Sequence, residues 1–234
     1  MKVAALLPFL GIALLVVAPA SGALIDVGVW DFNGETPYES DGTNEEFVAN
    51  AGTLAGNATL LFHKGGGYGT DFALEDGQGT TVNAPAGTAA GNNVRLQRGE
   101  RWNNAPITVN FDATGLSDIV LTFAARWYSG GVTGFQASYS TDGETFVDFG
   151  SQQSFPTDEY ATVTVSPGSA LDGAGDAYIR LTLTDDGGAT WNKAHAVRLD
   201  NFLLQAVPEP ATLAMLGVGG LALIGSRRAR NRGA

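Results

Sequence analysis

Polar and apolar residues alternate along much of this chain. This pattern predicts β-strands that turn one face to a core and the other to solvent. In residues 178–184, Ile179, Leu181 and Leu183 fall on one face of such a strand. The same alternation recurs in shorter stretches at 107–111, 135–139, 162–165 and 197–204. The sequence therefore predicts a strand in each of these stretches.

Four further stretches complete the pattern. Residues 119–125 form an almost continuous apolar run, which predicts a central strand buried on both faces. Asp142-Gly143 lies within residues 139–146 and predicts a hairpin, because glycine readily adopts the positive φ of a tight turn. Residues 54–63 fit either a helix or a strand. Residues 80–93, rich in Gly, Ala, Thr and Asn, predict a long exposed loop.

The predicted fold is all-β, a β-sandwich of the jelly-roll kind. About ten short strands, with no capped amphipathic helix between them, indicate two packed sheets in one domain. An immunoglobulin-type sandwich usually has about 100 residues, fewer than positions 24–206 provide. A parallel β-helix is the alternative fold, although it needs a regular repeat that this sequence lacks.

The N-terminal segment predicts a secretory signal peptide at residues 1–23. Lys2 supplies the positive charge, residues 3–17 are apolar, and small residues follow at the cleavage positions. Cleavage after Ala23 is preferred to cleavage after Ala20, because Pro19 lies beside the earlier site. An uncleaved N-terminal anchor is the alternative. Export through the Sec translocon follows from the signal peptide.

The C-terminal segment, residues 207–234, predicts a short and temporary transmembrane helix. Its apolar run of about 15 residues spans about 22 Å as a helix, whereas a bilayer core is about 30 Å thick. Several glycines weaken the helix further. Arg227, Arg228, Arg230 and Arg232 follow the run and would stay on the cytoplasmic side. A permanent C-terminal anchor is the alternative.

The order of elements in this tail closely resembles the PEP-CTERM sorting signal of Gram-negative bacteria. Val207, Pro208, Glu209 and Pro210 come first, the apolar run follows, and the arginine cluster ends the chain. The resemblance implies recognition of the Pro-Glu-Pro element by an exosortase and removal of the tail. It also implies delivery to the cell surface or to an extracellular matrix. The folded domain would then be residues 24–206.

Composition narrows the chemistry of this domain. Residues 24–206 keep 23 of the 24 acidic residues but only 8 of the 13 basic ones, a net charge of −15. Nucleic-acid binding is therefore not expected, because phosphate contacts need basic patches. The chain has no cysteine, which excludes thiol catalysis and zinc–thiolate sites. Divalent cations are possible partners for so acidic a domain.

The two ends of the domain resemble carbohydrate-binding jelly-roll modules. The residues that carry this resemblance are the segment Trp30-Asp31-Phe32-Asn33-Gly34 and residues 197–202, which include Asp200. The resemblance implies a structural calcium ion held by Asp31 and Asp200. The acidic residue usual in these modules two positions after Asp31 is Asn33 in this chain. Alternatively, Asp31 caps a turn and Asp200 is a surface carboxylate.

Two tryptophans are candidates for contacts with sugars. Trp102 and Trp191 lie among polar residues, where an indole face can stack on a sugar ring while neighbours bond its hydroxyls. Trp30 and Trp127 flank apolar strands and are expected in the core. Packing in the core is the alternative for all four.

Signals for catalysis are sparse. His63 and His195 are the only histidines and lack the spacing of a metal site. A GxSxG nucleophile elbow is missing, and Asp185-Asp186 fits a turn better than a catalytic pair. The sequence therefore predicts a non-enzymatic surface or biofilm-matrix protein that associates with exopolysaccharide or surface glycans. A purely structural matrix component and a glycan-processing enzyme are the alternatives.

Overall fold

The computed structural model describes residues 22–40, 44–63, 72–97, 102–128, 132–185 and 196–209. All of them except Gly22 belong to one compact unit, Ala23–Glu209. The apolar stretches of the predicted signal peptide and of the C-terminal segment lie outside the described residues. Within the described ranges, no helix has the length and hydropathy to cross a membrane.

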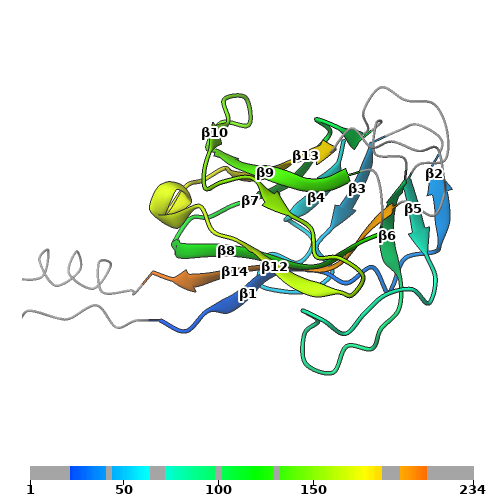
Figure 1. The fold of residues 1–234 in the computed structure, drawn as a ribbon. Helices are drawn as coiled ribbons and strands as arrows, with labels where there is room; N and C mark the ends of the chain where they lie inside the picture. The colour runs from blue at the N-terminus through cyan, green and yellow to red at the C-terminus, as the bar shows by residue number, and fades with distance from the viewer. Residues whose placement is uncertain are drawn as a thin grey trace, which may run out of the picture. The chain divides into compact units, whose positions relative to one another are not determined.

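Two antiparallel seven-stranded sheets form the layers of a sandwich (Figure 1). The first, sheet A, has the order β12-β8-β14-β6-β5-β2, with β1 also paired to β14. Its strands are β1 (Ile25–Trp30), β2 (Tyr38–Ser40), β5 (Phe72–Glu75), β6 (Asn93–Gln97), β8 (Leu116–Trp127), β12 (Ala161–Val165) and β14 (Ala196–Pro208).

The second layer, sheet B, has the order β10-β9-β13-β7-β4-β3, with β11 also paired to β9. Its strands are β3 (Glu45–Val48), β4 (Thr59–Phe62), β7 (Pro106–Phe111), β9 (Val132–Ser140), β10 (Val147–Asp148), β11 (Gln153–Ser154) and β13 (Ala177–Asp185). A single 3-10 turn, η1 (Gly168–Leu171), completes the described elements.

The architecture confirms the predicted all-β sandwich of jelly-roll type. The alternating stretches form β7, β9, β12, β13 and β14. The run at 119–125 forms the middle of β8, an inner strand of sheet A whose outward positions are only partly covered. Of the two readings of residues 54–63, the strand is right for the second half, because a turn leads into β4.

Inward-facing aromatic side chains join the two sheets. Phe47 packs edge-on against Phe32 and Phe62, with ring centroids 5.1 and 5.9 Å apart. Phe202 stacks on Phe123 within sheet A at 4.8 Å and meets Phe62 of sheet B edge-on at 6.3 Å. Phenylalanine rings bury large apolar areas, so this cluster contributes strongly to the stability of the sandwich.

A β-bulge divides the longest strand, β14. The pairing of β14 with β8 shifts by one residue between Asp200 and Leu203, and Asn201 adopts a left-handed φ of 47°. Before the bulge Val197 and Leu199 face the core, and after it Phe202 and Leu204 do so. The extra residue thus restores the inward parity of the apolar side chains.

The bulge also holds the loop between β5 and β6. The carboxylate of Asp200 accepts a hydrogen bond from the Thr80 amide at 2.8 Å. The side-chain amide of Asn201 donates to the carbonyls of Thr80 and Val82 at 2.7 and 3.0 Å. The side-chain amide of Asn83 donates to the backbone carbonyl of Asn201 at 2.8 Å. The segment predicted as an exposed loop is therefore a loop, but one bonded to the centre of sheet A.

Candidate functional site

A row of charged side chains crosses the outer face of sheet A. Arg198 on β14 lies opposite Arg95 on β6 and Arg126 on β8, in direct cross-strand register. Ala73 and then Glu39 continue the same row on β5 and β2. Strand alternation explains the row, because the neighbours of each arginine along its strand face the core.

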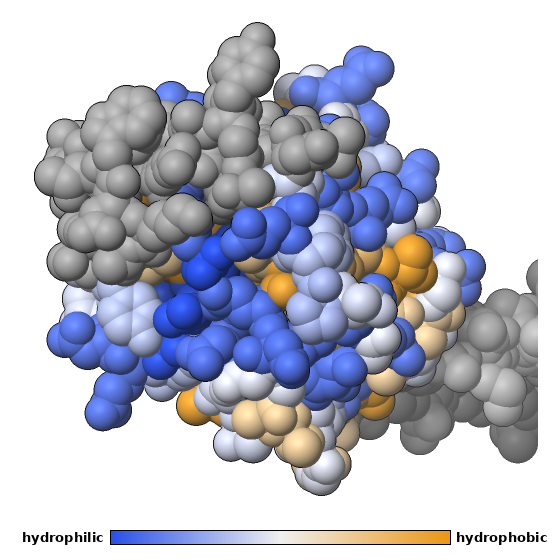
Figure 2. Space-filling view, turned by 90° about the vertical axis from the view of Figure 1, so that its right-hand side faces the viewer, coloured by the Kyte–Doolittle hydropathy of each residue, from blue (hydrophilic) through white to orange (hydrophobic). Residues whose placement is uncertain are grey.

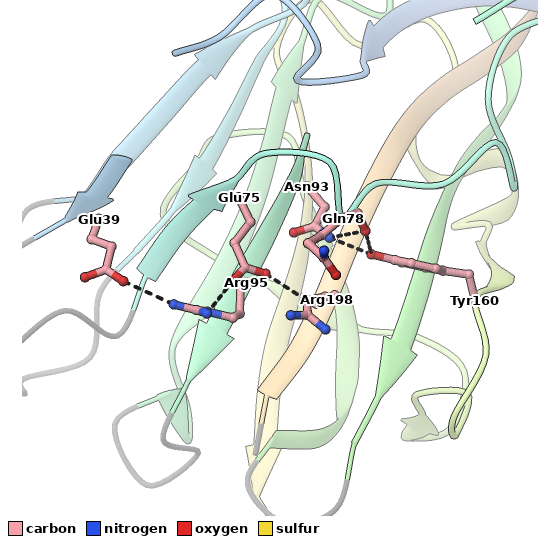
Figure 3. A network of polar contacts seen from close by, with 7 residues as sticks. All are labelled: Glu39, Glu75, Gln78, Asn93, Arg95, Tyr160 and Arg198. Carbon is pink, nitrogen blue, oxygen red and sulfur yellow. Dashed lines mark hydrogen bonds and ion pairs between the residues drawn. The ribbon is translucent and has the colours of Figure 1, made fainter. Parts of the chain in front are cut away.

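Two glutamates balance the arginines of this row (Figure 3). Glu75 binds Arg95 through one carboxylate oxygen and accepts from Arg198 Nε at 2.8 Å through the other. Glu39 also pairs with Arg95, at 3.3 Å. The side chains of Glu75, Arg95 and Arg198 are only 16–17% exposed, so these ion pairs are screened less than surface pairs. The network therefore holds the guanidinium groups in fixed orientations.

Two tyrosines support the other end of the row. The Arg126 guanidinium lies 4.5 Å from the ring centroid of Tyr160 and 5.0 Å from that of Tyr128. The Arg198 guanidinium lies 5.3 Å from the Tyr128 ring. Such cation–π contacts favour a cation close to an aromatic ring, so Arg126 is fixed without a carboxylate of its own in the described part of the chain.

The Tyr160 hydroxyl links this end of the row to the loop. It donates to the Gln78 carbonyl at 3.1 Å and accepts from the Asn93 amide at 2.8 Å (Figure 3). Burial raises the pKa of Tyr160 to about 12, so the hydroxyl stays protonated at physiological pH. Asn93 is fully buried, and its Oδ1 has no hydrogen-bond partner in the described part of the chain. An unpartnered buried acceptor favours a further donor, such as water or a ligand hydroxyl.

The charged row borders a recess of about 400 Å³. Its lining includes Glu39, Ala73, Glu75, Gln78 and Arg95. Figure 2 looks onto the side of the domain where β2, β5 and β6 lie in Figure 1, and hydrophilic residues dominate the described part of this surface. Ala73 contributes little side-chain volume, which leaves space between the flanking charged groups. The arrangement suits a polar ligand better than an apolar one.

The predicted acidic pair lies next to this face. β1 and β14 are adjacent, as the prediction required, and the charge of Asp31 contributes to raising the pKa of Asp200. Asp31 accepts from the Asn50 side chain at 2.6 Å and from the Asn33 amide at 3.1 Å. Asp200 is 1% exposed, and burial raises its pKa to about 7.

Oxygen atoms of three residues lie close to Gly79, beside Asp200. Two of them accept backbone hydrogen bonds at 2.8 Å, the Gly91 carbonyl from the Gly79 amide and Asp200 Oδ2 from the Thr80 amide. A β-carbon placed on Gly79 would lie 2.7 Å from the carbonyl oxygens of Gly91 and Asn92, and 2.9 Å from Asp200 Oδ2. Calcium prefers several oxygen ligands, including carbonyls. The described residues contain no cluster of three or more acidic or histidine side chains, so carbonyl and amide oxygens would complete the set. The oxygen donors are therefore of the types that calcium binds.

The structure corrects one of the two tryptophan candidates. Trp102 is 1% exposed and packs near Phe72, so its indole face is not open to a sugar ring. Trp191 lies outside the described residues. Trp30 is a core residue as predicted, and its Nε1 donates to the Phe47 carbonyl at 3.0 Å. Trp127 is partly buried and packs against the core.

The sequence did not predict the row of arginines. Its composition showed only that basic residues are few, and the polar neighbours of Trp102 led to the wrong prediction that this side chain contacts sugars. One usable signal was present: Arg95, Arg126 and Arg198 each occupy a polar position within an alternating strand. Their assembly into one row depends on strand order, which alternation does not reveal. Of the histidines considered for metal binding, His63 directly follows β4 of the opposite sheet, and His195 lies outside the described residues.

The C-terminal tail matches a known sorting signal. Residues 206–229 match the PEP-CTERM protein-sorting motif, which confirms the resemblance seen in the sequence. This motif indicates an exported protein that is sorted to the cell surface. The folded domain reaches into the motif, because β14 continues through Val207 and Pro208. The Glu209 amide then donates to the Gly115 carbonyl at 2.8 Å. The described fold therefore meets the motif without a linker.

Solved structures resemble this chain at the level of the sandwich. The xylan-binding CBM22-1 domain of Paenibacillus barcinonensis Xyn10C is 12% identical, with 82% of this chain and 99% of that domain covered and a TM-score of 0.39. The K1 cleaved adhesin domain of Lys-gingipain from Porphyromonas gingivalis W83 is 10% identical, with 78% and 98% covered and a TM-score of 0.41.

A third similar structure is an enzymatically active domain. Tailspike protein 4 of bacteriophage CBA120 is 13% identical over 64% of this chain, with a TM-score of 0.39. The chain spans only 19% of that tailspike chain. Among curated proteins, the sequence finds no match. TM-scores this low assign no ligand to this chain.

We expect the metal-free protein to lose stability as the pH rises toward 7. The pKa of Asp200 is about 7 in the fold, against an ordinary value of 3.8. Protonation therefore favours the folded state. Its contribution is fully present below about pH 4 and is lost as the pH rises through about 7. Urea titrations in EDTA should show this loss as a fall in the free energy of unfolding of up to about 1.4 kcal/mol per pH unit.

The difference between wild type and Asp200→Asn isolates this effect. Burial lowers the pKa of His63, so protonation of His63 at low pH favours the unfolded state. This effect acts in the opposite direction and is common to both proteins. Asp200→Asn should show a smaller fall in stability, whereas Asp148→Asn, at an exposed site on β10, should behave as wild type. Identical pH curves for wild type and Asp200→Asn would contradict the assignment.

Proposed function

We propose that this protein is exported, sorted to the cell surface by an exosortase, and binds a neutral polysaccharide there through the outer face of sheet A. Binding involves no bond cleavage. The ligand belongs to the exopolysaccharide matrix or to surface glycans. The proposal combines the PEP-CTERM motif with a preorganised polar face, and the single observation that carries it is the ordered row of arginines.

The chemistry of this face suits sugar hydroxyls. A guanidinium group presents several N–H donors in a fixed plane, and carboxylate and amide oxygens supply acceptors beside them. The ion pairs and cation–π contacts fix these groups before a ligand arrives, which reduces the ordering cost of binding. Since Glu39 and Glu75 balance the nearby arginines, the recess offers both donors and acceptors. A chain of neutral sugars presents the same mixture of groups.

The Arg198→Gln variant tests this function. Arg198 joins the ion-pair half of the row to its aromatic half, so its loss should weaken binding by about tenfold, the effect of one charge-assisted hydrogen bond of about 1.5–3 kcal/mol. Affinity electrophoresis on xylan, β-glucan and galactan measures retention of the exported protein. Gln152→Ala, at an exposed site in the connection between β10 and β11, is the control and should be retained like wild type.

Two other results would replace the proposal. Failure of every polysaccharide to retain the wild-type protein would favour a structural matrix component without a specific ligand. Release of reducing ends from a retained polysaccharide would favour a glycan-processing enzyme. Melting temperatures of the variants show whether Arg198→Gln is still folded.

The sorting part of the proposal has its own test. Removal of the tail by the exosortase should yield a surface protein that lacks the arginine cluster. Mass spectrometry of the protein from cells should therefore find a C-terminus upstream of Arg227, and Glu209→Ala should reduce processing. A mature protein that still carries Arg227, Arg228 and Arg230 would refute it.

We also propose that Asp31 and Asp200 hold a structural calcium ion. Its support is the convergence of the Asp200 carboxylate with the carbonyls of Gly91 and Asn92 beside Gly79. The ion would bind only the folded state and would tie the loop between β5 and β6 to β14. At one hundred times its dissociation constant, a ligand of this kind stabilises the fold by about 2.7 kcal/mol.

Thermal denaturation in EDTA and in millimolar calcium measures this stabilisation. The melting temperature of wild type should rise with calcium, and Asp31→Asn should remove most of the rise. Asp148→Asn again serves as the matched control. A wild-type melting temperature that is unaffected by calcium would count against the ion.

A further inference from the structure

A groove of about 260 Å³ lies on the outer face of sheet B, away from the charged row of sheet A. Two outward-facing rows form its floor. Leu61, Thr108 and Arg180 lie in register in the first row, on β4, β7 and β13. Thr59, Asn110 and Tyr178 lie in register in the second row. All six residues line the groove.

The Asp-Gly hairpin forms one wall of this groove. It connects β9 to β10 (Figure 1). It also contributes Gly143 and Phe146 to the lining of the groove. Gly143 has a φ of 75°, and a β-carbon there would lie 3.0 Å from the Tyr178 ring. Glycine is thus required both by the backbone conformation and by the close approach to Tyr178. The hairpin is thereby seated against the floor of the groove.

Arg180 supplies a positive charge that forms no ion pair within the described residues. Its guanidinium carbon lies 3.3 Å from the centroid of the Phe146 ring, so the group stacks on this ring. In the described part of the chain no carboxylate forms an ion pair with Arg180, and its buried Nε has no hydrogen-bond partner. A guanidinium held by its flat face keeps its N–H edge available for a planar, two-pronged acceptor.

Thr108 provides an independent sign of a ligand. Its side chain is 7% exposed, lies directly between Leu61 and Arg180 in the row, and lines the groove. The buried Thr108 hydroxyl has no hydrogen-bond partner among the residues that the structure describes. A buried hydroxyl without a partner costs about 1–3 kcal/mol, so a ligand that bonds to it gains a favourable contact. Valine would fill the same space without this cost.

We propose that this groove binds a carboxylate-bearing sugar unit, a uronate of an acidic polysaccharide. The carboxylate pairs with the N–H edge of Arg180, a ring hydroxyl bonds to Thr108, and the ring lies against Leu61 and the aromatic wall. The groove is smaller than the roughly 300–1,000 Å³ of typical small-molecule pockets, which favours a single sugar unit. The positive charge of Arg180, which forms no ion pair within the described residues, favours a ligand that carries a carboxylate.

This site goes beyond the proposed function. It lies on the other sheet, uses different residues, and selects a charged sugar instead of a neutral one. Two glycan-binding faces on one exported domain would let it bridge neutral and acidic chains of a matrix. Either site can fail without the other, because no lining residue of the groove belongs to the row on sheet A.

Matched ligands test the role of the charge. Isothermal titration calorimetry on the exported protein would use tetramers of galacturonate, glucuronate and mannuronate, together with the methyl ester of the galacturonate tetramer. At least one acid should bind, and esterification of galacturonate should weaken its binding about tenfold or more, because a charged hydrogen bond of about 1.5–3 kcal/mol is lost. Failure of all three acids to bind, or equal binding of galacturonate and its ester, would overturn the proposal.

Variants test the two contacts separately. Arg180→Lys keeps the charge but loses the planar fork, so affinity for the bound acid should fall about tenfold or more, following the same magnitude. Thr108→Val should fold with unchanged or higher stability and bind about two- to tenfold more weakly, as expected for one neutral hydrogen bond. Thr53→Val, at an exposed turn, is the control for Thr108→Val. Wild-type affinity in Thr108→Val and Arg180→Lys would overturn the assignment of these contacts.

Discussion

The bulge at Asp200 and Asn201 is the constraint on which most of the polar architecture depends. β14 is hydrogen-bonded to β8 along one edge and to β6 and then β1 along the other. An irregularity in β14 therefore affects all three neighbouring strands. The left-handed Asn201 turns its amide toward the loop between β5 and β6 and shifts the later apolar residues back to the core. At position 201, a side chain that cannot donate to carbonyl groups would leave the loop unbonded and would also disturb the strand geometry.

The loop held by this bulge completes one face of the domain. Gln78, at its start, receives hydrogen bonds from Asn93 and Tyr160, and Tyr160 in turn lies beneath Arg126. The position of one polar loop is thus coupled to the arrangement of the charged row. Burial of Asp200 beneath the loop has an electrostatic cost, which a bound proton or a cation would relieve. Stability and the order of the candidate site are consequently linked through one carboxylate.

The two outer faces of the sandwich differ in how their arginines are held. On sheet A, Glu39 and Glu75 pair with Arg95 and Arg198, while Arg126 packs on two tyrosine rings, so most of the positive charge of the row is paired. On sheet B, Arg180 is stacked on Phe146 and lacks a carboxylate partner within the described residues. In a domain with a formal charge of −15, an unbalanced cation in a groove is a local exception. Arg180 thus gives the outer face of sheet B a ligand preference of its own, although both sheets share a single core.

The sequence by itself determined the strands, the sandwich and the sorting tail. Alternation depends on neighbours along the chain, so 107–111, 162–165 and 178–184 could be read directly, and the PEP-CTERM elements are contiguous. The resemblance to carbohydrate-binding modules implied that Asp31 and Asp200 lie near each other at the first and last strands, and the structure pairs β1 with β14.

Tertiary structure decided which polar residues meet and which aromatic ring is exposed. Trp102 has polar neighbours in sequence yet is buried, because its position relative to Phe72 follows from the packing of both sheets. Arg95, Arg126 and Arg198 come from distant strands, and only the order β8-β14-β6 places them in one row. Alternation specifies which face of a strand is polar, but strand order and register depend on long-range hydrogen bonds and on filling a common core.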